Sequence, residues 1–96
     1  MNENYAQLKA VISVLGKDRP GIVAHVSALL MDAGANIDDI NQSILQNMFA
    51  MTMLVTLNEN IKNFNEVQNK LSALGEQLGL EMRISREDLY ESMYKI

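Results

Sequence analysis

The spacing of apolar residues changes several times along this chain, and the order of these changes limits the folds that it can adopt. In four segments the apolar residues alternate with others, which is typical of strands, and in two they recur at every third or fourth position, which is typical of helices. We expect strands over 6–15, 36–46, 48–57 and 80–85, and helices over 22–33 and 64–78. The predicted order is therefore strand, helix, strand, strand, helix, strand.

This order predicts the α+β class with one particular topology. Two right-handed βαβ crossovers that share one antiparallel sheet form a ferredoxin-like βαββαβ sandwich, which has four strands and both helices on one face. We expect a single domain over residues 1–96, with a core of about 6–86 and a short C-terminal helix in the tail 86–96. In that tail Leu89, Met93 and Ile96 would share one face.

Local signals predict where the helices begin and end. Pro20 suits the first turn of the first helix, where a missing N–H has no helical partner. Asn63 and Glu66 have the spacing of a capping box at the start of the second helix. Gly34 and Gly79 follow the two apolar stripes and are predicted to end the helices in the left-handed conformation.

The face of the sheet opposite the helices is predicted to be partly apolar. The residues expected there or at its rim are Val11, Leu15, Met48, Ala50 and Leu54. A monomer rarely exposes this much apolar surface, so we expect a homodimer or another partner protein. The polar segment 36–46 is typical of an edge strand, in which Asp38 and Asp39 would point to opposite faces and could not share a metal ion.

Composition argues against several functional classes. The net charge is −4 with a pI near 4.8, and the eight Lys and Arg residues are scattered, which disfavours nucleic acid as a partner. There is no cysteine, and His25 is the single histidine, so we expect no metal site, no cofactor and no catalytic pair. No signal peptide and no apolar run of roughly 20 residues is present, which predicts a cytoplasmic protein without a membrane partner.

The loop between the first strand and the first helix is the strongest candidate for a binding site. It runs through Gly16-Lys17-Asp18-Arg19-Pro20-Gly21. Its glycines let the backbone approach a ligand, and the first N–H groups of the following helix favour a carboxylate or phosphate. Asp18 could instead form only a turn or cap. Arg19 is expected to be a solvated cation, and the alternative is that it contacts a ligand carboxylate or an acidic residue of a partner.

Two runs of this sequence resemble the ACT domain family: G-K-D-R-P-G-I-V-A-H-V-S-A-L-L at 16–30 and G-A-N-I-D-D-I-N-Q at 34–42. They are similar to the ACT domains of formyltetrahydrofolate deformylase, of the glycine cleavage system transcriptional repressor and of small single-domain bacterial proteins. The resemblance implies a regulatory module without enzymatic activity, whose effector, an amino acid or related metabolite, lies between two domains. It implies contacts from Asp18, Gly21, Ile22, Val23, Asn36 and Ile37.

Two other functions are compatible with the same fold. The chain could be a ligand-independent module that dimerises or docks onto a regulated protein. An acylphosphatase-like enzyme would need a loop arginine and a strand asparagine, for which Arg19 and Asn41 are the candidates, although the D-R-P-G loop is not that family's pattern. If the loop binds an effector, Gly21→Val is expected to abolish binding with little change in stability.

Overall fold

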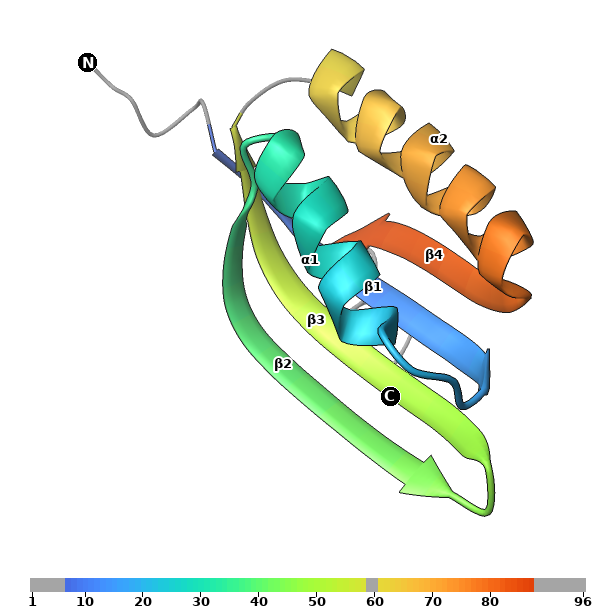
Figure 1. Cartoon of the computed structure of the whole chain (residues 1–96). Helices are drawn as coiled ribbons and strands as arrows, with labels where there is room; N and C mark the ends of the chain where they lie inside the picture. The colour runs from blue at the N-terminus through green and yellow to red at the C-terminus, as the bar shows by residue number, and fades with distance from the viewer. Residues whose placement is uncertain (1–6, 59–60, 88–96) are drawn as a thin grey trace.

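The computed structural model describes residues 7–58 and 61–87, and its elements follow the predicted order (Figure 1). The strands are β1 (Gln7–Lys17), β2 (Asn36–Leu45), β3 (Met48–Asn58) and β4 (Leu80–Arg86). The helices are α1 (Ile22–Asp32) and α2 (Ile61–Leu78). The ferredoxin-like βαββαβ prediction is confirmed, whereas the predicted helix in the tail lies outside the described residues.

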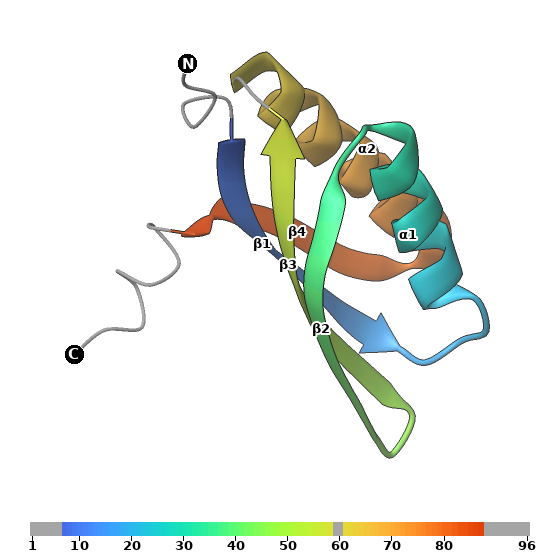
Figure 2. The same ribbon diagram turned by 90° about the vertical axis from the view of Figure 1, so that its left-hand side faces the viewer.

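The four strands form one antiparallel sheet in the order β2-β3-β1-β4. The most apolar strand, β3, therefore lies inside the sheet, and the polar strand β2 lies at an edge, as predicted. A two-residue turn joins β2 to β3, and both of its residues, Gln46 and Asn47, have positive φ angles of 46° and 73°. Such turns match the twist of a hairpin. The hairpin extends beyond the rest of the sheet (Figure 2).

The core lies between the sheet and the two helices, which pack on the same face of the sheet (Figure 2). Alternate residues of β1 and β3 point into it, and the helices contribute residues at three- and four-residue spacing. Its fully buried side chains include Ile12, Leu30, Met53, Leu57 and Leu71. Burial of each such side chain stabilises the fold by about 1.5–3 kcal/mol, so this face holds the two layers together.

The helix ends agree only in part with the local signals. Gly34 and Gly79 have φ angles of 78° and 72° and end the helices as predicted. The prediction for Pro20 was wrong, because Gly21 is the N-cap of α1 and Pro20 precedes it. The capping-box prediction was also wrong: α2 begins at Ile61, so Asn63 lies inside the helix. Ile61 stands three residues before Phe64 and so continues the helical spacing of apolar residues.

The strand register confirms which residues lie on the face opposite the helices. The predicted residues Val11, Leu15, Met48, Ala50 and Leu54 all share that face. Their exposure is uneven, since Val11 is 2% exposed and Leu15 is 47% exposed. Neither helix in the described ranges is long and apolar enough to cross a membrane.

Candidate functional site

The loop of residues 18–21 connects the end of β1 to α1, and all four of its residues are exposed. The first backbone bond of α1 runs from the His25 N–H to the Gly21 carbonyl, at 2.9 Å. The N–H groups of residues 22–24 therefore have no acceptor within the helix. These groups, together with the positive end of the helix dipole, form a place where a carboxylate or phosphate can be accepted.

The predicted loop residues differ in what they can offer a ligand. The Asp18 carboxylate forms no hydrogen bond or ion pair with any residue of the two described ranges, so it is free to contact one. The Ile22 side chain is 2% exposed and belongs to the core, and Val23 packs against the core. These two residues can therefore offer a ligand mainly their backbone N–H groups.

Gly21 adopts φ +83°, a left-handed conformation that side chains rarely occupy. A Cβ atom placed there would contact His25 at 3.6 Å, an ordinary van der Waals distance, so a larger side chain at this position is not prevented by lack of space. The expectation that Gly21→Val changes stability little conflicts with this conformation, because Gly21 is the N-cap residue before α1 and lies outside the right-handed helical region. The left-handed conformation costs a residue with a Cβ atom about 1–2 kcal/mol, and a β-branched residue is the least tolerant. This substitution cannot separate binding from folding.

Arg19 has a partner that the sequence did not indicate. Its Nη1 donates a hydrogen bond to the Leu78 carbonyl at the end of α2, at 3.1 Å and across 59 positions of the chain. Arg19 is exposed, as expected of a solvated cation, but its guanidinium also has this contact within the chain. The structure does not bring Arg19 and Asn41 together, as an acylphosphatase-like site would require. Asn41 pairs with Thr52 on the face of the sheet opposite the helices, whereas the Arg19 guanidinium lies at the end of α2. The acylphosphatase-like hypothesis thus has no support from their placement.

The two remaining predicted residues, Asn36 and Ile37, lie at the opposite end of the sheet from the loop. Asn36 pairs with Thr56, which also pairs with Lys9, near the start of β1. The loop instead follows Lys17, at the other end of β1. The eleven residues of α1 rise about 1.5 Å each, so the two groups are separated by roughly 16 Å or more. One chain does not bring all six predicted residues together.

A polar cluster surrounds Asn36. The Asp38 carboxylate accepts hydrogen bonds from the Thr56 hydroxyl and the Asn36 amide, both at 2.6 Å. The Lys9 ammonium lies 3.8 Å from the same carboxylate and donates to the Thr56 hydroxyl at 3.3 Å. The Thr56 hydrogen bond is the main cause that lowers the pKa of Asp38; the Asn36 bond and the Lys9 charge act in the same direction, and partial burial opposes them.

This cluster coincides with an irregularity in β2. The pairing of β2 with β3 shifts between Ile37 and Asp39, so Asp38 is the extra residue of a β-bulge. The prediction that Asp38 and Asp39 point to opposite faces was therefore wrong. Asp38 bonds to Thr56, and Asp39 pairs with Leu54, which places both on the face opposite the helices. Even so, no group of three or more potential metal ligands occurs among the described residues.

The Asp38 cluster predicts a pH dependence of stability. Because the folded-state pKa lies below the ordinary value of 3.8, the ionised group stabilises the fold fully above that value, and this contribution is lost as the pH falls through the folded-state pKa. Urea unfolding of Asp38→Asn should therefore show a smaller loss between neutral pH and about pH 3 than the original protein shows. Asp39→Asn is the matched control, since within the described ranges the Asp39 carboxylate accepts only the Ile40 N–H. Equal losses in all three proteins would contradict the prediction.

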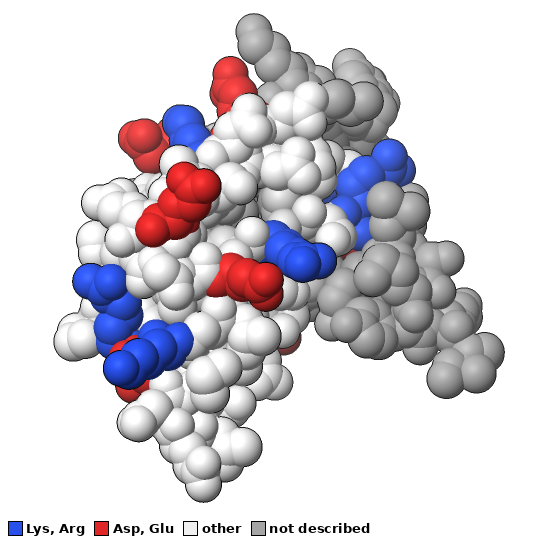
Figure 3. All heavy atoms as spheres, turned by 90° about the vertical axis from the view of Figure 1, so that its right-hand side faces the viewer, with Lys and Arg blue, Asp and Glu red and all other residues white. Residues whose placement is uncertain are grey.

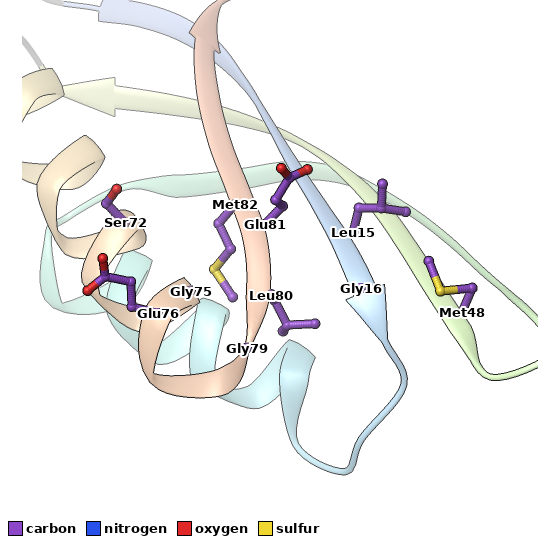
Figure 4. A pocket seen from close by; sticks show the side chains of 10 residues that line it. All are labelled: Leu15, Gly16, Met48, Ser72, Gly75, Glu76, Gly79, Leu80, Glu81 and Met82. Carbon is purple, nitrogen blue, oxygen red and sulfur yellow. The ribbon is translucent and has the colours of Figure 1, made fainter.

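An open groove lies where the end of β1 meets α2 and β4 (Figure 4). Leu80 fills the space beside Gly16: a Cβ atom on Gly16 would lie only 2.5 Å from the Leu80 Cδ2. Glu76 and Glu81 line the groove, and acidic and basic side chains are interspersed over the face shown in Figure 3. The described residues of this face therefore form no basic patch of the kind that binds nucleic acid.

Two helices on one face of a β2-β3-β1-β4 antiparallel sheet, with an exposed loop before α1, define a ferredoxin-like domain in which the candidate residues form two separate groups. The family comparison is more specific. The model of the ACT domain family matches residues 9–85, and the chain belongs to this family of regulatory domains.

Individual relatives agree with this assignment. A UPF0237 protein from Methanopyrus kandleri is 42% identical, over 92% of this chain and 98% of its own length. The structure of an ACT domain protein from Streptococcus pneumoniae has a TM-score of 0.77 and 39% identity, and the match covers 91% of this chain and 98% of the other. A putative glycine cleavage system transcriptional repressor has a TM-score of 0.75 and 32% identity, and the match covers 83% of this chain but 46% of that longer one.

Proposed function

We propose that this chain is a regulatory domain, not an enzyme, and that two copies bind an amino acid or a related small metabolite at their interface. The observation that carries the proposal is the separation of the two groups of candidate residues. The loop lies at one end of β2 and Asn36 at the other, while the outer edge of β2 has no neighbouring strand in the described sheet.

Antiparallel pairing of the β2 strands of two copies about a two-fold axis would bring the loop of one copy close to Asn36 of the other. The axis would cross the middle of β2, so that the partner's copy of Asn36 meets the end of this β2 near Leu45, beside the loop. Two equivalent sites would result. Exposed apolar residues favour the same pairing, because Ile40 and Ile44 project from β2 on the helix side and are 39% and 59% exposed. A second copy would cover them.

The proposed site suits a molecule that carries both a carboxylate and an amine. Its carboxylate would accept hydrogen bonds from the free N–H groups at the start of α1. Its amine would lie near the Asp18 carboxylate, which is exposed and has no other partner in the described chain. The Asn36 amide of the second copy would complete the contact by leaving Asp38. A free amino acid has these groups at the required short separation.

The first experiment is a thermal-shift screen of the protein against each common amino acid at about 10 mM, since a ligand at 100 times its Kd adds about 2.7 kcal/mol of stability. One-carbon metabolites form a second set. We expect at least one amino acid to raise the midpoint clearly. If no compound in either set does so, the effector proposal fails and a ligand-independent interaction module takes its place.

A mixing experiment then tests whether the site is shared between copies. Asp18→Ala and Asn36→Ala should each lose binding of the compound that the screen identifies. When the two variants are unfolded together and refolded, half of the dimers are mixed and each mixed dimer has one intact site, so about a quarter of the original sites should return. A site built within one chain would return none, and this result would contradict the shared site.

A further inference from the structure

Arg19 extends from the candidate loop to a different part of the fold. Its guanidinium donates to the carbonyl of Leu78, the last residue of α2, and the contact is partly buried. The last four carbonyl groups of a helix have no partner within the helix, and a cation near them also interacts favourably with the negative end of the helix dipole. Arg19 therefore supplies a hydrogen-bond donor to one of the unpaired carbonyl groups at the end of α2.

The loop is held on its other side as well. The Asp18 N–H donates to the Asn47 carbonyl in the turn between β2 and β3, at 2.7 Å. Two successive residues of the loop are thus bound to two elements that are distant in sequence. A loop with anchors on both sides has fewer conformations to lose when a ligand binds, and such preorganisation increases affinity.

The residues that follow the Arg19 contact, at the junction of α2 and β4, are closely packed against the end of β1. Gly79 follows Leu78 with φ +72°, and Leu80 then pairs with Gly16, two positions before the loop begins. The Leu80 side chain occupies the space beside Gly16, and Figure 4 shows these residues together at the corner of the fold. Close-packed contacts of this kind leave little room for independent movement. These contacts connect the loop to the junction of α2 and β4.

We propose that Arg19 is a positioning residue, which holds the loop of residues 18–21 ready for the effector and couples its occupation to the junction at 78–80. The inference deepens the proposed function and rests on it for the effector. The coupling is reciprocal in free energy: if the junction stabilises the binding form of the loop, a bound effector must stabilise the junction.

Hydrogen exchange of the full chain tests this proposal without an effector. Arg19→Met keeps most of the side-chain length and removes the donors. We expect faster exchange in the segments 18–19 and 78–80, where the Asp18 N–H is bonded to the Asn47 carbonyl and Leu80 pairs with Gly16, with the core strands unchanged. Arg19→Lys retains a cation that can donate to a helix end and should restore slow exchange in part. Unchanged exchange at both segments in Arg19→Met would overturn the proposal.

A second measurement uses a mixture of the twenty common amino acids as the probe. In the original protein the mixture should slow exchange at 78–80 as well as at the loop; in Arg19→Met it should act at the loop alone, with binding weakened about tenfold. Equal protection of 78–80 in both proteins would overturn the coupling. If the mixture changes nothing in the original protein, the proposed function and the coupling both fail, while the ligand-free exchange still decides whether Arg19 holds the loop.

Discussion

Ile44→Glu is expected to convert the proposed dimer into a folded monomer. Ile44 lies on the helix side of β2 and is 59% exposed in the single chain, so a carboxylate there stays in water while the protein is monomeric. In the proposed interface two unpaired carboxylates would be buried by symmetry, and each costs several kcal/mol. Light scattering at about 100 μM should therefore give the monomer mass, because a loss of this size weakens association by several orders of magnitude. Circular dichroism should be unchanged.

Asn69→Glu is the matched control, because it adds the same charge at an exposed position of α2, away from β2. It should remain dimeric. Leu15→Glu tests the alternative interface, the face of the sheet opposite the helices, because Leu15 is exposed there. A dimer that survives Ile44→Glu but dissociates with Leu15→Glu would show that the copies associate through that face. The proposed site shared along β2 would then be excluded.

Gly75→Ala is expected to destabilise the protein, although alanine is the better helix former. Gly75 is buried in α2, and an added Cβ atom would lie 2.7 Å from the backbone carbonyl oxygen of Leu80. This oxygen cannot rotate away as the end of a side chain could. Helix propensity favours alanine by about 1 kcal/mol, but overpacking against backbone costs about 1–3 kcal/mol and separates α2 from β4. We expect the second effect to dominate.

Thermal melts at one protein concentration measure this effect. A net loss of about 1 kcal/mol lowers the Tm of a domain of this size by roughly 4–8 °C. Ser72→Ala, at an exposed position one turn earlier in α2, should change the stability by no more than about 0.5 kcal/mol. An unchanged or higher Tm for Gly75→Ala would mean that α2 can move away from Leu80 at no cost.

The sequence by itself was sufficient to determine the order of the elements and which residues of β1 and β3 lie on each face of the sheet. These features depend on the spacing of apolar residues and on glycines such as Gly34 and Gly79, whose effects act over a few positions of the chain. The D-R-P-G loop also indicated the correct family, since it combines residues with special backbone requirements in a fixed order. In each case the determining physical effect is local.

Only the tertiary structure decided features that depend on pairing between distant segments. The bulge at Asp38 arises from the register between β2 and β3 and brings Asp38 to Thr56, 18 positions away. The bond from Arg19 to Leu78 requires the end of α2 to lie beside a loop 59 positions earlier. The separation of Asn36 from that loop follows from the direction of β2 in the sheet. Apolar spacing specifies which face a residue occupies, but the strand register and the packing of the helices determine which residues meet.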